Sequence, residues 1–255
     1  MLFSKVILHK RNLFQLLAYK LSEKFNNYIF NRTFRPEYEI LIDYHLSKEE
    51  NKNLDHISII EFGVASGKSL KYIEALKPKF EKKYQLKINI FGFDTFEGMP
   101  KSQNKHDQLY DWKEGDYSSN YENVKTSLNY SKLIKGDIKR SINLELFNNL
   151  NISNILVIFF DLDFFTSTND SFKIFDKSFS KFLRPRVGLF FDNLQSSSEF
   201  SGEYFSIKKF NEENHINNKF ISKDFYLEKF DNRFYQYMNF EHELFNENFK
   251  NIQFL

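Results

Sequence analysis

The sequence has no cysteine in its 255 residues. This absence excludes disulfide bonds, thiolate metal ligands and a cysteine nucleophile, and it agrees with a reducing, cytoplasmic location, which we expect. Only eight glycines and four prolines are present, too few for long irregular or low-complexity linkers. A chain of this length can bury a substantial core as one large α/β domain, so the sequence requires no second globular domain.

Strong net charge is also absent, because the formal charge is +2 at pH 7. A nucleic-acid partner is therefore not expected. The charge is uneven, however, since residues 1–36 hold seven Lys or Arg against the single acid Glu23. Apolar residues recur there at three- and four-residue intervals, which predicts an amphipathic helix with a basic face over residues 9–30.

The longest uncharged run in this helix, residues 12–19, is too short to cross a membrane. We expect the helix to pack on the main domain or to pair with a second copy of the chain, in preference to lying on an anionic membrane surface. Residues 1–54 are thus predicted to be an N-terminal helical extension, with a polar helical connector over 37–56. Residues 55–255 are predicted to be the main domain.

A glycine turn follows the first predicted strand. Residues 57–62 are mainly β-branched and aromatic, Gly63 and Gly67 punctuate the turn, and a helical pattern begins near Ser69. Such a turn presents backbone N–H groups and a helix N-terminus to a ligand at the edge of a parallel sheet. It is one residue too short for a phosphate loop and lacks the G-x-G-x-x-G register. Taken alone, it is equally well explained as an ordinary βα turn.

Further strands are predicted at residues 87–94, 132–135, 154–161 and 186–191, with two antiparallel strands near 219–229 and 232–240. The run at 154–161 is continuously apolar, as expected of a central parallel strand covered on both faces. Helices are predicted over 121–128, 139–150 and 202–214, and Ser167 or Thr168 is predicted to cap another that continues to about Phe182. The polar loop over residues 101–118 is typical of a lid or substrate loop.

Five predicted strands end in a glycine turn or an acid. Because the carboxyl ends of parallel strands meet at one edge, these positions are expected to share one rim. Each acid has an ordinary explanation as a turn or cap residue, but their coincidence across five strands favours a ligand site. A carboxylate closing the second strand suits two vicinal ribose hydroxyls. The five positions are Gly63 to Gly67, Asp94, Gly136-Asp137, Asp161 with Asp163, and Asp192-Asn193.

Two motifs resemble a known family. EFGVASGKS at residues 61–69 resembles the glycine motif of Rossmann-like S-adenosylmethionine-dependent methyltransferases. GFDTFEGMP at residues 92–100 is similar to the "GFDSFEGLP" signature of the macrocin O-methyltransferase group, which methylates sugar hydroxyls in antibiotic biosynthesis. Later motifs extend the resemblance over about residues 55–215. It implies an α/β fold: a Rossmann-like, doubly wound, mostly parallel seven-stranded sheet with an antiparallel C-terminal strand.

The resemblance also implies a cofactor, S-adenosylmethionine, and the residues around it. The predicted cofactor-binding residues are Glu61, Gly63, Ala65, Gly67 and Ser69 at the methionine portion, Asp94, Thr95 and Phe96 at the ribose, and Asp137 and Ile138 near the adenine. In metal-dependent relatives, including catechol O-methyltransferase, equivalent positions bind Mg²⁺. The residues that match those ligands are Asp161, Asp192 and Asn193.

The chemistry of methyl transfer to a hydroxyl agrees with a metal at these residues, because a divalent ion held by oxygen ligands lowers the pKa of a bound hydroxyl. The predicted catalytic residues are Asp161, Asp163 and His106, with Asp111 a further candidate base. The sequence thus predicts a Mg²⁺-assisted O-methyltransferase acting on the hydroxyl of a sugar or other small polar acceptor.

Two alternatives stay open. One is a nucleotide-triphosphate-dependent kinase that uses Lys68 in the short glycine loop together with Asp161. The other is a non-catalytic adaptor that keeps the fold and binds membranes through residues 1–36.

Overall fold

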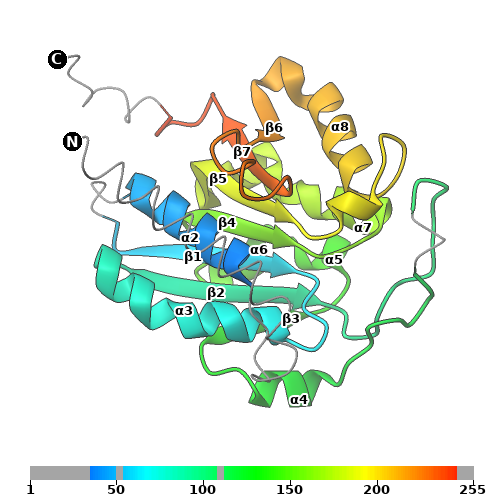
Figure 1. The fold of residues 1–255 in the computed structure, drawn as a ribbon, viewed down its shortest axis with the longest axis horizontal. Coiled ribbons are helices and arrows are strands. Elements are labelled where there is room, and N and C mark those ends of the chain that lie inside the picture. Colours follow the sequence, from blue (N-terminus) through cyan, green and yellow to red (C-terminus); the bar gives the residue numbers. More distant parts are fainter. Residues whose placement is uncertain (1–34, 50–53, 108–111, 246–255) are drawn as a thin grey trace.

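The computed structural model describes residues 35–49, 54–107 and 112–245, and Figure 1 shows their fold. Seven strands form one sheet in the order β3-β2-β1-β4-β5-β7-β6. The helix predicted over residues 9–30 lies outside the described residues. The strands are β1 (His56–Phe62), β2 (Lys87–Asp94), β3 (Ser131–Lys135), β4 (Ile155–Phe160), β5 (Leu183–Phe191), β6 (Lys219–Lys223) and β7 (Phe234–Asn239).

The sheet is doubly wound and mostly parallel. Strand β1 pairs in parallel with β2 on one side and with β4 on the other, and β3 and β5 extend the sheet outward in parallel. Strand β7 runs antiparallel to both β5 and β6. The predicted seven-stranded sheet with an antiparallel C-terminal strand is confirmed. Its strand order reverses direction between β1 and β4, the place where open α/β sheets bind ligands.

Helices cover both faces of this sheet (Figure 1). One buried cluster joins α2 and α3 to one face, and a second joins α6, α8 and the turns after α7 to the other. All six residues of β4 are buried, as its apolar run predicts. The helices are α2 (Pro36–Glu49), α3 (Lys68–Tyr84), α4 (Tyr121–Thr126), α5 (Ile138–Ser141), α6 (Leu144–Asn149), α7 (Phe165–Ser171) and α8 (Gly202–Asn214).

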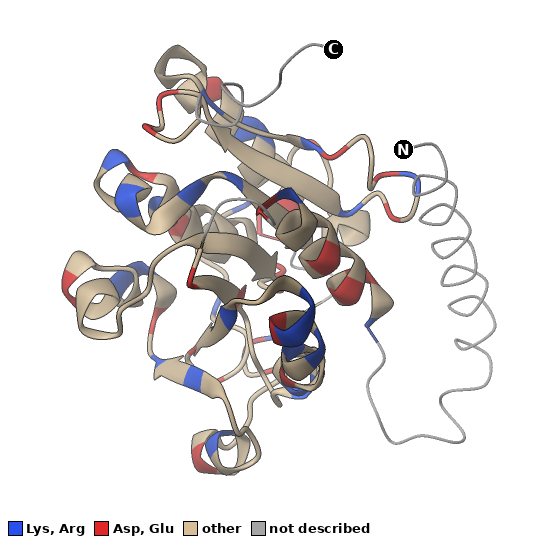
Figure 2. Ribbon diagram, turned by 90° about the vertical axis from the view of Figure 1, so that its left-hand side faces the viewer, with Lys and Arg blue, Asp and Glu red and all other residues tan. Residues whose placement is uncertain are grey.

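Helix α2 forms most of the helical connector predicted over residues 37–56, but it ends at Glu49 and packs on the sheet. Its Tyr38 ring stacks on Phe159 of β4 at 3.8 Å between centroids, and most of its residues are buried. Gly188 of β5 permits this packing, because a Cβ there would overlap the His45 ring. Figure 2 shows acidic residues on α2 near the lysine-bearing α3, and Lys79 of α3 pairs with an α2 glutamate. The predicted domain boundary at residues 54–55 stays a prediction.

The chain between β4 and β5 differs from its prediction. Helix α7 begins at Phe165, ends at Ser171 and is followed by two 3₁₀ turns, Phe172–Phe175 and Lys177–Phe182. Neither predicted cap residue caps this helix. The backbone N–H of Thr166 instead donates to Asp107 Oδ1, 2.8 Å away, from the preceding loop. A tertiary contact has taken the place of a local cap.

Two further boundaries differ for local reasons. The helix predicted over residues 139–150 is divided into α5 and α6, because the Asn143 side chain accepts from the Leu146 N–H and starts a new helix. Strand β6 ends at Lys223, where Asp224 Oδ1 accepts from two following N–H groups and starts a turn. No helix in the described ranges combines the length and apolar character needed to traverse a lipid bilayer.

Candidate functional site

A cavity of about 1070 Å³ lies at the carboxyl edge of the parallel strands. All five strand ends that the sequence predicts at one rim contribute to its wall. This volume is at the upper end of the range for small-molecule sites. The strand-end residues in its wall are Gly63, Asp94, Asp137, Asp161 and Asp192.

The glycine turn forms one side of the cavity. Gly63 has a φ of +86°, and a Cβ at this position would overlap the carbonyl oxygen of Asp161. The backbone of β1 therefore approaches the end of β4 more closely than any other residue type permits. Gly67, with φ +74°, turns the chain into α3 and is not one of the residues that line the cavity.

Asp94 holds the glycine turn in place from the neighbouring strand. Its Oδ2 accepts from the N–H groups of Val64 and Ala65 at 2.7 and 2.8 Å, and its Oδ1 accepts from the N–H of Phe96 at 2.6 Å. A carboxylate offers about four lone-pair sites, so it can still accept from a ligand hydroxyl. Asp94 both shapes the turn and faces the cavity.

The other predicted cofactor residues divide into two groups. Those in the cavity wall are Gly63, Ala65, Asp94, Thr95, Asp137 and Ile138, whereas Glu61, Gly67, Ser69 and Phe96 lie outside it. Glu61 is fully buried, and the Tyr38 hydroxyl donates to its Oε1 at 3.3 Å. Burial raises the pKa of Glu61 to about 8, so its carboxyl group is neutral at pH 7.

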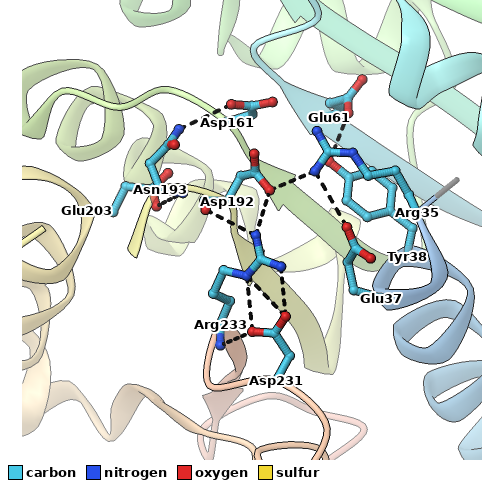
Figure 3. A network of polar contacts seen from close by, with 10 residues as sticks. All are labelled: Arg35, Glu37, Tyr38, Glu61, Asp161, Asp192, Asn193, Glu203, Asp231 and Arg233. Carbon is cyan, nitrogen blue, oxygen red and sulfur yellow. Dashed lines mark hydrogen bonds and ion pairs between the residues drawn. The ribbon is translucent and has the colours of Figure 1, made fainter. Parts of the chain in front are cut away.

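The far end of the rim carries an acidic cluster (Figure 3). The Asn193 side chain donates to Asp161 Oδ1 at 3.3 Å, and the Asn193 N–H donates to Glu203 Oε2 at 3.0 Å. Burial, followed by the charge of Asp192, raises the pKa of Asp161 to about 7. Burial also raises the pKa of Glu203 well above its usual value. The Asp161 carboxyl group, which lies in the cavity wall, therefore holds its proton more tightly than an ordinary aspartate, as does Glu203 buried behind it.

Two arginines converge on Asp192 (Figure 3). Arg35 Nη1 donates to Asp192 Oδ1 at 2.7 Å, and Arg233 Nη1 donates to the same oxygen at 3.0 Å. Arg233 also binds Asp231, at 2.7 Å from its Nη2. The predicted metal residues Asp161, Asp192 and Asn193 are therefore neighbours, but Asp192 is engaged by cations. Within the described ranges, no group of three or more His, Cys, Asp or Glu side chains is arranged to hold a metal ion.

The predicted catalytic residues lie in different places. Asp161 and Asp163 are in the cavity wall, and Asp163 has a left-handed φ of +59°. His106 is outside the wall: its Nδ1 lies 2.7 Å from the Phe200 carbonyl oxygen and its ring packs on Phe205 at 4.4 Å. Asp111 lies outside the described residues.

The predicted substrate loop contributes directly to the cavity. Met99, Trp112 and Tyr117 are in its wall, and the Trp112 and Tyr117 rings meet edge to face at 5.7 Å between centroids. The indole N–H of Trp112 is buried and has no hydrogen-bond partner in the described part of the chain. Asp107 anchors the loop, because its Oδ2 accepts from the N–H groups at residues 103 and 104 while Oδ1 binds α7.

Lys68 does not support the kinase alternative. It is the first residue of α3, is exposed and lies outside the cavity wall. A phosphate loop directs its lysine at the bound phosphates. The glycine turn lacks that arrangement here.

No family model matches the sequence, and no curated protein matches it either. Solved structures do resemble it. Calicheamicin methyltransferase CalS11 is 21% identical over 82% of this chain and 81% of its own, with a TM-score of 0.55. A structure of apo CalS11, a TDP-rhamnose 3′-O-methyltransferase of calicheamicin biosynthesis, is 19% identical over 82% of each chain, with a TM-score of 0.47.

The chain has the methyltransferase fold. The resemblance to Rossmann-like methyltransferases is thereby confirmed at the level of the fold.

Within this methyltransferase fold, three side chains at the site escaped the sequence prediction. Arg35 precedes the first strand by about twenty residues, and no motif marks it. Asp107 is one of many polar residues in the loop over residues 101–118, and nothing in the sequence distinguishes it from the others. Glu203 follows the glycine that starts α8, and an acid in the first turn of a helix has an ordinary explanation. Only their placement in three dimensions connects them to the rim.

Proposed function

We propose that this protein is an S-adenosylmethionine-dependent O-methyltransferase that acts on a hydroxyl of a sugar or other small polar molecule. One observation carries the proposal: a single cavity joins the Asp94-held glycine turn to Asp161, whose pKa is about 7. The methyltransferase fold supports it.

The residues at one end of the cavity fit this cofactor. Gly63 and Ala65 present main chain without bulky side chains, and Asp94 has lone pairs left for ribose hydroxyls. Asp137 and Ile138 follow β3, where they would border the adenine. The three strand ends thus offer one continuous surface to an adenosine group, and the described residues of this wall include no cluster of cations suited to a triphosphate. The bound cofactor would supply an activated methyl group on a sulfonium centre.

Asp161 is the residue that we assign to proton transfer. A hydroxyl is a poor nucleophile near pH 7, so its oxygen needs a base when it reacts. A buried carboxylate with a raised pKa matches that task, because it is a stronger base than an ordinary aspartate. Asn193, which donates to Asp161 Oδ1, orients the carboxylate.

The loop side of the cavity suits a polar acceptor with apolar faces. Trp112 and Tyr117 offer aromatic surface, and the unpaired indole N–H of Trp112 can donate to a ligand oxygen. A sugar ring presents both C–H faces and hydroxyl oxygens. This match supports a sugar or a similar small polyol as acceptor.

The predicted Mg²⁺ does not fit the side chains as they are arranged here. Asp192 Oδ1 already accepts from two guanidinium groups, and the side-chain amide nitrogen of Asn193 donates to Asp161. The two guanidinium groups already balance the charge of Asp192 and would repel a further cation beside it. The reaction that we propose therefore takes no step through a metal ion.

Isothermal titration of the purified protein with S-adenosylhomocysteine, in parallel with ATP, tests the proposal. We expect micromolar binding of S-adenosylhomocysteine and none of ATP. Binding of ATP alone would support the kinase, and binding of neither ligand by the folded protein would overturn the proposed function. A screen of sugar acceptors for methyl transfer then tests the substrate class.

A further inference from the structure

Arg35 is a cation at a rim otherwise dominated by acids. It lies just before α2, forms part of the cavity wall, and about three quarters of its side chain is buried. Its Nη1 pairs with Asp192 at 2.7 Å and lies 3.5 Å from Glu37 (Figure 3). In the described part of the chain, Nε and Nη2 have no hydrogen-bond partner. A guanidinium group carries five N–H donors in a planar fork, so one edge of Arg35 remains available.

The strand order gives the direction in which a cofactor would lie. Asp137 follows β3, Asp94 ends β2 and Gly63 follows β1, so an adenosine group bound as proposed occupies the β3–β2–β1 side. The amino-acid end of the same cofactor then extends from β1 towards β4 and β5. The side chains in that part of the cavity wall include Asp161, Asp192 and Arg35.

That amino-acid end carries a carboxylate, which the two aspartates would repel. The described cavity wall contains three cations, Arg35, Lys101 and Lys135. Lys135 ends β3, on the adenosine side, and its ammonium lies over the Tyr121 ring. Lys101 belongs to the substrate loop. Arg35 is therefore the wall cation on the β4–β5 side, and it binds Asp192 and influences Asp161 electrostatically.

We propose that Arg35 binds the α-carboxylate of the cofactor through its Nε and Nη2 edge while Nη1 stays on Asp192. This role rests on the proposed function. Asp192 Oδ1 accepts from Nη1 at 2.7 Å, and Tyr38 lies beneath the guanidinium group with 5.3 Å between the Arg35 Cζ and the ring centroid. Arg35 is thus a cofactor-binding residue supplied from outside the βα motifs.

A ligand-truncation experiment tests this role. Titrate the wild type, Arg35→Met and Arg35→Lys with S-adenosylhomocysteine and with its decarboxylated analogue, S-adenosyl-3-thiopropylamine. For the wild type we expect S-adenosylhomocysteine to bind roughly 10- to 100-fold more tightly, the range of charge-assisted hydrogen bonds. Arg35→Met should bind both ligands about equally, at the wild-type affinity for the analogue. Arg35→Lys should keep part of the preference, because it has charge without the fork.

Arg233→Met is the matched control. Arg233 binds the same Asp192 oxygen but lies outside the cavity wall. We expect this variant to keep the preference for the carboxylate-bearing ligand. Analogue binding by Arg35→Met shows that the variant is folded.

The two hypotheses fail in different ways. If Arg35→Met weakens both ligands by the same factor, or if the wild type does not distinguish them, the role of Arg35 is wrong and the cofactor assignment stands. If the folded wild type binds neither ligand, both the proposed function and this role are overturned.

Discussion

Gly63 and Asp161 are in backbone contact across β1 and β4, and a Cβ on Gly63 would overlap the Asp161 carbonyl oxygen. This contact connects the glycine turn to the acid that we assign to catalysis. The geometry of one therefore depends on the other.

Replacement of Gly63 by alanine should be strongly destabilising. The substitution combines strain at a φ of +86° with a backbone overlap that no side-chain rotation relieves. We expect the free energy of unfolding in urea to fall by about 3 kcal/mol or more. Gly115→Ala is the matched control: its φ is +85° but no atom lies within 4 Å of its Cβ position, so only strain of about 1 kcal/mol applies. Equal losses in the two variants would contradict the overlap.

Asp94→Asn should impair stability and ligand binding together. The amide has one acceptor oxygen, so it cannot satisfy all three N–H groups that the carboxylate accepts. We expect the free energy of unfolding to fall by about 1–3 kcal/mol and S-adenosylhomocysteine to bind at least tenfold more weakly. Asp137 lies in the same wall and accepts from one N–H at the start of α5. Asp137→Asn should therefore lower the free energy of unfolding less than Asp94→Asn does. Unchanged binding in Asp94→Asn would remove Asp94 from the cofactor site.

Asp161→Asn should lower the methyl-transfer rate by about 10²- to 10⁴-fold, the usual contribution of a general base. Because its pKa is raised to about 7, Asp161 is protonated below that pH, and the wild-type rate should rise through about pH 7 and then level off. In Asp161→Asn, the rates measured across this pH range should no longer show that rise. Asp163→Asn is the comparison, since asparagine tolerates its left-handed backbone. A larger loss in Asp163→Asn would transfer the role of base to Asp163.

The buried His45 should make stability depend on pH. Burial lowers its pKa to about 3, whereas the unfolded histidine titrates near 6.5. The unfolded state then binds the extra proton, so this contribution is complete above pH 6.5 and is lost as the pH falls towards 3. A change from about pH 7.5 to 5.5 should therefore lower the free energy of unfolding by about 1.4 kcal/mol through His45.

Urea unfolding of the wild type and of His45→Leu at both pH values checks this value. The variant should lose the His45 contribution, whereas His215→Gln, at an exposed position, should behave as the wild type does. Parallel pH dependence in the wild type and His45→Leu would contradict the assignment.

Removal of divalent ions by chelation tests the predicted Mg²⁺ site directly. Because Asp192 is paired with Arg35 and Arg233, we expect methyl transfer to persist after exhaustive treatment with EDTA. Activity that disappears on chelation and returns with added Mg²⁺ would restore the predicted metal site. Calorimetric titration of Mg²⁺ into the protein without an acceptor gives an independent measurement.

Much of the fold followed from local pattern. The apolar run of β4, the alternation of strands with helices and the glycine turn predict the parallel sheet, because each depends on neighbours in sequence. Parallel strands share an edge by geometry, so the five strand ends were predicted at one rim. The boundaries that differ, at α7 and between α5 and α6, are set by side chains that accept hydrogen bonds from backbone N–H groups.

The sequence by itself therefore determined the sheet, the rim and the acids on it. Only the tertiary structure decided how those acids are used. Arg35 reaches the rim because α2 packs on β4 and β5 through Tyr38, a long-range contact that no local pattern encodes. The pKa of Asp161 likewise depends on burial and on Asp192, some thirty residues later. Proton affinity and ion pairing are properties of the folded surroundings, which the order of residues specifies only through the complete packing of the chain.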